Sequence, residues 1–160
     1  MTIYMQIPNV KGNVSADNYT GWIELGAIQF GASRSLIQTV GKTTDRSSAH
    51  PSIKQIEITK QLDKASHELL KNVLVGNSLG TVNIHVCRIS NGAVLPYAKY
   101  SLEKTMVSNY QEVIGSDGAP QERITLSFTK LERAYIPMDQ GGREQSPLIM
   151  GYDLETAKFM

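Results

Sequence analysis

The sequence contains one cysteine, Cys87, which excludes an internal disulfide, so the fold has to rest on its hydrophobic core. We expect Cys87 to be a small buried hydrophobe within a strand. A reactive thiol would need a cationic neighbourhood, and Arg88 alone is weak support for one. No stretch approaches 18 apolar residues, so no segment is expected to insert into a membrane.

The sequence also lacks an excess of charge of either sign: 16 lysines and arginines face 15 acidic residues, for a net charge of +1. The cations are scattered singly, so the basic cluster needed to bind nucleic acid is absent and no nucleic-acid partner is predicted. The first residues have no basic start followed by an apolar core and a cleavage site, so no signal peptide is expected. A chain of this length is expected to form one domain, residues 1–160.

Motifs that carry catalysis or bind metals are missing as well. No HExxH, paired CxxC, G-x-S-x-G or P-loop pattern occurs, and no two histidines stand at metal-ligand spacing. The histidines are His50, His67 and His85. The Ser66–His67 pair with Asp63 is more typical of a helix cap than of a catalytic set, and His85 is expected to be a solvated or pore-facing strand residue. The sequence therefore predicts no enzyme, no metal site and no cofactor.

One helix is predicted, over about residues 66–75. Ser66 or Asp63 is expected to cap its first N–H groups, and Gly76 suits the left-handed position after its last turn. A helix this short is marginal alone in water, so its apolar face has to pack on something larger. The face expected to pack consists of Leu69, Leu70, Val73 and Leu74.

The rest of the chain is dominated by alternating apolar and polar residues, which predicts about eight strands. Between Leu25 and Ile28 the alternation slips by one residue, which predicts a bulge or sharp bend at Gly26. The expected strands cover residues 2–7, 21–31, 53–62, 81–88, 97–102, 105–113, 121–136 and 148–154, with a short partner strand possible at 33–39 and a tail at 155–160. The pattern favours a small antiparallel barrel or sandwich with the helix on one side.

Residues 40–52 are almost free of apolar side chains and form a loop of unusual length. Loops of more than about 12–15 residues are uncommon in compact domains unless they are functional or disordered. The segment is therefore interpreted either as a plain surface loop or as a contact segment.

The order of these features resembles the Hcp family, the haemolysin-coregulated proteins of bacterial type VI secretion systems. The most specific matching motifs are the Asp63-Lys64-Ala65-Ser66 entry to the helix and the Gly151–Leu154 exit. Further matches are Val10-Lys11-Gly12, Gly21–Leu25, Thr59-Lys60 and Val86-Cys87-Arg88, whereas Asn9, His67 and Glu132-Arg133-Ala134 depart from the usual pattern. The match extends over nearly the whole chain.

The resemblance implies a mainly β fold, a compact antiparallel barrel of two sheets with one short helix. It also implies a non-catalytic subunit that forms homohexameric rings, which stack into a tube tipped by a VgrG-type spike and driven by contractile sheath and baseplate proteins. Small effector proteins would travel in the lumen. The tube would assemble in the bacterial cytoplasm and be secreted, without a signal peptide, to the extracellular space or a target cell.

The extended loop would then supply the contact between subunits or rings. The residues expected at this interface are Lys42, Thr43, Thr44, Asp45, Arg46, Ser47, Ser48 and His50. Two alternatives stay open: a monomeric β-sandwich that binds carbohydrate or protein through an exposed Trp22 and tyrosines, and a small hydrolase that uses His85 and scattered carboxylates.

Overall fold

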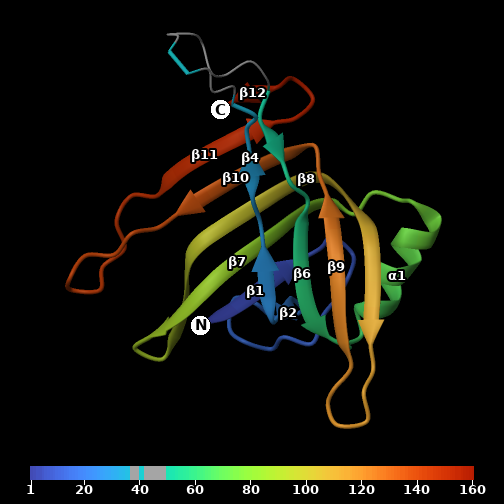
Figure 1. Cartoon of the computed structure of the whole chain (residues 1–160). Helices are drawn as coiled ribbons and strands as arrows, with labels where there is room; N and C mark the ends of the chain where they lie inside the picture. Colours follow the sequence, from blue (N-terminus) through green and yellow to red (C-terminus); the bar gives the residue numbers. More distant parts are fainter. Residues whose placement is uncertain (37–39, 42–49) are drawn as a thin grey trace.

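The computed structural model describes residues 1–36, 40–41 and 50–160. Most of this part of the chain is strand, with one helix between the sixth and seventh strands (Figure 1). The elements are β1 (Thr2–Gln6), β2 (Ile23–Leu25), β3 (Ala27–Gln29), β4 (Ala32–Ser33), β5 (Ser52–Ile53), β6 (Ile56–Gln61), α1 (Ser66–Val75), β7 (Gly80–Ser90), β8 (Ala93–Val113), β9 (Gln121–Ser127), β10 (Lys130–Tyr135), β11 (Leu148–Asp153) and β12 (Lys158–Phe159).

The strands form two antiparallel layers that share β8. One layer has the order β12-β11-β10-β8-β7-β1-β2, and the other pairs β3 with β6, β6 with β9 and β9 with β8. Strands β4 and β5 form a separate two-stranded ladder that pairs residues 32–33 with 52–53, on either side of the loop. The mainly β class with antiparallel sheets and one short helix is confirmed, although the described strands do not close into a complete barrel.

Strand β8 is the long connector between the layers. Residues up to Glu103 pair with β10 and residues up to Thr105 with β7, whereas residues from Met106 onward pair with β9. At the change of layer Lys104 takes a left-handed conformation, with φ of 50°. The sequence predicted two strands here and one long strand over residues 121–136. The structure instead fuses the first two into β8 and divides the third at Phe128–Thr129, because both sides of this hairpin bend at the same corner.

The predicted irregularity at Gly26 is the second corner between the layers. Strand β2 pairs with β1 before it, and β3 pairs with β6 after it. At the corner the Gly26 N–H donates to the carbonyl of Thr59, with N and O 2.7 Å apart. The one-residue slip in the apolar pattern thus marks where the chain passes from one layer to the other.

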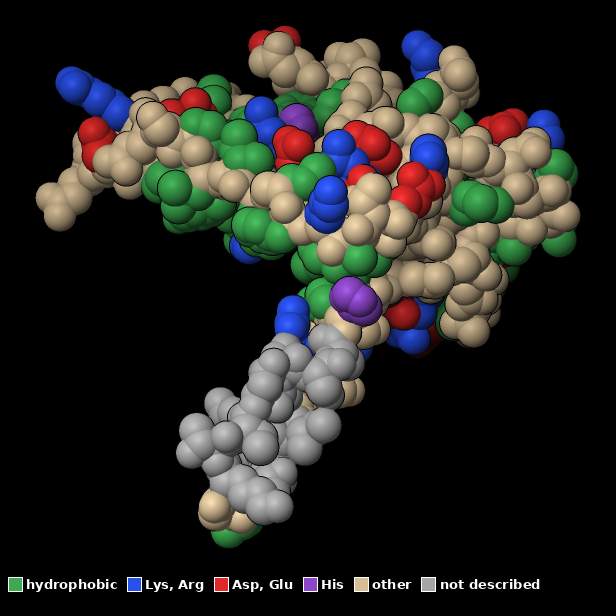
Figure 2. Space-filling view, turned by 90° about the horizontal axis from the view of Figure 1, so that it is seen from above, with side chains coloured by type: hydrophobic (Ala, Val, Ile, Leu, Met, Phe, Trp, Pro, Cys, Tyr) green, Lys and Arg blue, Asp and Glu red, His purple; other side chains and the backbone are tan. Residues whose placement is uncertain are grey.

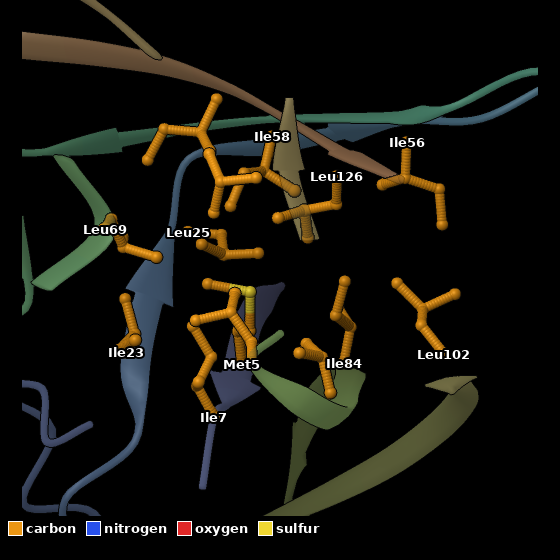
Figure 3. Close-up of a cluster of buried hydrophobic side chains, with 14 of the residues drawn as sticks. Met5, Ile7, Ile23, Leu25, Ile56, Ile58, Leu69, Ile84, Leu102 and Leu126 are labelled. Carbon is orange, nitrogen blue, oxygen red and sulfur yellow. The ribbon is translucent and has the colours of Figure 1, made fainter. Parts of the chain in front are cut away.

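The core lies between the two layers and is closed at one side by the helix. Side chains of both layers point toward one another there, and Leu69 of α1 joins them (Figure 3). The labelled members are Met5, Ile7, Ile23, Leu25, Ile56, Ile58, Leu69, Ile84, Leu102 and Leu126, all of them buried.

The helix packs on this core through a narrower face than the sequence predicted. Leu69 is fully buried and Val73 is half-buried against the core. The expectation that Leu70 and Leu74 share this face is wrong, because they lie about 100° around the helix from Leu69 and Val73 and remain 38% and 77% exposed. Gly76 ends the helix in the left-handed conformation, as expected.

Candidate interaction surfaces

A buried lysine fixes the position of the helix start. In β6 the residues Ile56, Ile58 and Lys60 alternate on one face, so Lys60 points into the core with the two isoleucines and is 1% exposed. Its direct cross-strand neighbour in β9 is Glu122, and Lys60 Nζ lies 2.6 Å from Glu122 Oε2. A buried charge needs a close partner of opposite sign, and the β6–β9 register supplies one.

The same ammonium group reaches the entry to the helix. Lys60 Nζ donates to Asp63 Oδ1 at 2.8 Å and to Ser66 Oγ at 3.1 Å. Asp63 Oδ1 also accepts the N–H of Ala65, so the carboxylate, rather than the hydroxyl of Ser66, stabilises the first turn. On the far side, the Tyr110 hydroxyl donates to Glu122 Oε1 at 2.6 Å, and burial together with this bond raises the pKa of Tyr110. The network ties β6, β8, β9 and α1 together.

The outer face of the helix is apolar near its C-terminal end. Leu70, Leu74 and Val75 are exposed there, Val75 by 57%. The last turn carries no basic residue, whereas Glu68 in the first turn suits the positive end of the helix dipole. Apolar surface of this kind on a helix is typical of a contact with another molecule.

A second apolar surface lies on the pair β10–β11, which projects from the opposite side of the molecule (Figure 1). We call the paired residues 133–135 of β10 and 148–150 of β11 the wing. Figure 2 shows hydrophobic side chains gathered at this end, whereas charges of both signs are interspersed over the middle. A shallow hollow of about 290 Å³ in the wing is lined by Arg133, Tyr135, Leu148, Ile149 and Met150.

The wing also has an open strand edge. Within the described part of the chain, β12 pairs with Tyr152 and Asp153 of β11, Met160 pairs with Gly151, and no strand pairs with the outer edge of residues 148–150. Leu148 and Ile149 are 65% and 62% exposed. An apolar, unpaired edge promotes uncontrolled association unless another chain covers it.

The predicted loop interface lies mostly outside the described residues. Lys42, Thr43, Thr44, Asp45, Arg46, Ser47 and Ser48 fall in the segment 42–49 that the structure does not describe. His50 is described and exposed, two residues before β5. Strands β4 and β5 pair through Ala32–Ile53 and Ser33–Ser52, which brings residues 33 and 52, on either side of the loop, together.

His85 is half-buried against aromatic rings, so the expectation that it is solvated is wrong. The segment between β1 and β2 folds over the outer face of β1 and β7. There the Tyr19 hydroxyl shares a hydrogen bond with His85 Nδ1 at 3.0 Å, and the ring centres of Trp22 and His85 are 4.8 Å apart. Burial, with a smaller effect from Lys99, lowers the pKa of His85 to about 4. The imidazole is thus neutral at physiological pH.

The neighbouring Cys87 is fully buried, as predicted, and its thiol donates weakly to the Tyr19 oxygen at 3.4 Å. Burial raises the pKa of this thiol, which is the opposite of activation. Trp22 is half-buried against Tyr19 and His85, and not freely exposed as the carbohydrate-binding alternative assumes.

A cleft of about 320 Å³ lies beside the helix entry and is lined by carboxylates and amides, among them Glu24, Gln61, Asp63 and Gln121. None of its lining residues is a histidine or cysteine. Among the residues that the structure describes, no three His, Cys, Asp or Glu side chains converge to hold a metal ion. The same part of the chain contains no helix that is long and apolar enough to cross a membrane.

Two functional features escaped the sequence analysis. The buried position of Lys60 was readable from the alternation Ile56, Ile58, Lys60, and that of Glu122 from the alternation with Ile124 and Leu126. One feature of the sequence could have predicted the wing. The run Leu148–Met150 has three consecutive apolar residues, which break the alternation of a half-buried strand.

Comparison with solved structures first defines the class of protein. A chain described as a type six secretion system protein superposes with a TM-score of 0.92 at 24% identity, covering 99% of both chains. Hcp1 from Salmonella typhimurium gives a TM-score of 0.80 at 22% identity, covering 99% of this chain and 98% of that one. A type VI secretion system effector from Yersinia pestis gives 0.74 at 19%, covering 94% and 98%. The fold is therefore that of Hcp-type secretion proteins.

The family itself is shown by sequence. The model of the type VI secretion system effector family Hcp matches residues 4–135, most of the chain. The chain belongs to the Hcp family, as the resemblance predicted, and is accordingly a secreted protein of a type VI secretion system. No curated protein matches the sequence.

Proposed function

We propose that this chain is the structural subunit of a type VI secretion inner tube. Six copies form a ring, rings stack into a tube, and the tube leaves the cell with its spike while carrying small effectors in its lumen. The observation that carries the proposal is the family match over residues 4–135 in a chain that leaves two separate apolar surfaces uncovered.

Ring formation is supported by the placement of those surfaces. A closed ring of identical subunits needs two different patches on each subunit, related by a rotation that returns to the start. The wing and the outer helix face are two such patches, and they lie on opposite sides of the molecule (Figure 1). The net charge of +1 leaves little general repulsion between copies.

Stacking of rings is assigned to the extended loop. Its sequence, with Asp45 and Arg46 among small polar residues, suits a polar contact between rings. Exposed ion pairs contribute only about 0–1 kcal/mol each, so stacking would depend on repeating the contact around the ring. Such a contact permits a tube that assembles and comes apart, which suits a secreted device.

The remaining parts of the proposal follow from the family. The partners are a VgrG-type spike, contractile sheath and baseplate proteins, and small effectors in the lumen. Assembly takes place in the bacterial cytoplasm, and secretion needs no signal peptide. The subunit performs no catalysis, which agrees with the neutral, hydrogen-bonded state of His85 and the buried, deactivated thiol of Cys87.

The test is the assembly state of the purified protein. Light scattering coupled to size exclusion should give about six times the 17.6 kDa mass of one chain, and electron microscopy should show annular particles. A single 17.6 kDa particle at every concentration would contradict the proposal.

A further inference from the structure

The two apolar surfaces differ in shape. The wing presents a hollow, whereas the last turns of α1 present protruding side chains: Leu70, Leu74 and Val75. Neither surface is complementary to itself, since a hollow does not fill a hollow and two convex helix faces leave gaps. Packing between different surfaces is therefore favoured over a symmetric pair.

The wing hollow and the C-terminal end of α1 also carry charge of opposite sign. The one charged side chain that lines the wing hollow is Arg133, whose guanidinium lies 5.9 Å from the centre of the Tyr100 ring. The C-terminal end of α1 carries the negative pole of the helix dipole, and no basic residue of its own stands in the last turn. A cation in the hollow and an uncompensated negative helix end are complementary.

We propose that the wing hollow of one subunit receives the C-terminal turn of α1 from the next subunit in the ring. Leu74 and Val75 pack against Leu148 and Met150, and Arg133 faces the C-terminal end of the neighbour's helix. This inference rests on the proposed ring and adds to it the identity of the two mating surfaces.

The buried ion-pair network gives the contact its rigidity. Lys60 holds Asp63 and Ser66 at the helix entry, and Leu69 anchors the next turn in the core. The outer face of α1 is thus presented at a fixed angle to the sheets. A ring closes only if each contact repeats the same rotation, which a loosely attached helix would not provide.

Cysteine cross-linking tests which surfaces meet. A chain with Leu74→Cys and Leu148→Cys, both at exposed positions and with Leu148 on the same face of the wing as Met150 and Arg133, is oxidised and run on a non-reducing denaturing gel. We expect a ladder that ends at the closed ring, whereas each single variant stays monomeric because a thiol then meets no thiol. Cys87 is fully buried and does not take part. The matched control, Leu74→Cys with Ile114→Cys in the β8–β9 turn, is expected to give no ladder; Ile114 is as exposed as Leu148.

A charge swap tests the electrostatic part. Arg133→Glu places an anion against the negative helix end, and Val75→Arg places a cation against Arg133, so each single variant should shift the protein from rings toward single chains. The combination of the two should recover more ring than either alone, because the charges again have opposite sign. Thermal unfolding of each variant confirms that the fold is retained.

The outcomes separate this inference from the proposed function. If the unaltered chain forms rings but the double-cysteine chain gives no ladder and the swap shows no recovery, the pairing is wrong while the ring stands. A dimer from Leu74→Cys alone would also overturn it, because that would mean that helix meets helix. If the unaltered chain never forms rings, both the proposed function and the pairing of the wing with α1 are wrong.

Discussion

Lys60 and Glu122 face each other across β6 and β9 with both side chains fully buried, Nζ and Oε2 lying 2.6 Å apart. The pair is the polar centre of an otherwise apolar core, and it connects the strands to the helix entry through Asp63 and Ser66. Removal of Lys60 leaves the Glu122 carboxylate buried without a cation, whereas removal of Glu122 leaves Lys60 paired with Asp63.

We expect Lys60→Met to lower the free energy of unfolding by about 3–5 kcal/mol, and Glu122→Leu to lower it by less, because Asp63 still pairs with Lys60. The double variant should be less destabilised than Lys60→Met, because the fully buried carboxylate of Glu122 is then removed together with its cation. Urea titration followed by circular dichroism measures this. The exposed pair Glu57–Arg123 is the control: Glu57→Gln should cost below about 1 kcal/mol. Equal losses in the single and double variants would show that the charges do not compensate one another.

Stability should fall in mild acid through His85. Its pKa of about 4 in the folded protein lies below the ordinary 6.5, so the folded state binds fewer protons than the unfolded state between these values. The free energy of unfolding is therefore fully retained above about pH 6.5 and decreases as the pH falls toward 4, by about 1–3 kcal/mol. His85→Gln should remove this decrease from the plot of unfolding free energy against pH.

The control for this pH dependence is His67, which is exposed on the helix. His67→Gln should leave the profile unchanged. A profile that keeps its slope in His85→Gln would place the acid sensitivity in other groups.

Gly12 is expected to tolerate no side chain. A Cβ atom there would lie 2.3 Å from the Trp22 carbonyl oxygen and 2.7 Å from Ile23 Cα, both backbone atoms that cannot move aside independently. Gly12→Ala should cost about 1–3 kcal/mol and alter Trp22 fluorescence, since the segment covering His85 is displaced. Gly118→Ala, where a Cβ meets nothing within 4 Å, should have little effect. Equal stability of the two variants would show that the backbone at Gly12 does not pack as closely on Trp22 and Ile23 as the structure indicates.

Deletion of residues 43–48 should separate ring formation from stacking. Because β4 and β5 pair at the base of the loop and the wing and helix are untouched, rings should persist while tubes are lost. Electron microscopy of concentrated protein distinguishes the two products. Tubes of unchanged length would show that the loop does not carry the stacking contact.

Local pattern was enough to predict much of this fold. Alternation located the strands, the slip at Gly26 located a corner between layers, and Gly76 located the helix end. These features depend on residues close in sequence. The fusion of two predicted strands into β8 was not predicted, because the left-handed Lys104 interrupts the alternation while the hydrogen-bonded ladder passes from one partner strand to the next.

The interaction surfaces were harder to predict. Leu70 and Leu74 satisfy the spacing of a buried helix face, and only the tertiary structure shows that Leu69 and Val73 occupy the core instead. Apolar residues that meet another chain carry the same periodicity as apolar residues that meet the chain's own core. For that reason the wing and the outer helix face became visible only when their exposure was known.

The 21-residue strand β8 has a mechanical consequence. The wing is hydrogen-bonded to its first half, and the layer beside the helix to its second half, so a pull on the wing is transmitted along covalent backbone into the other layer. Shear between the layers would have to stretch this strand instead of peeling one sheet from the other. A subunit built in this way moves as one rigid block when it is pushed.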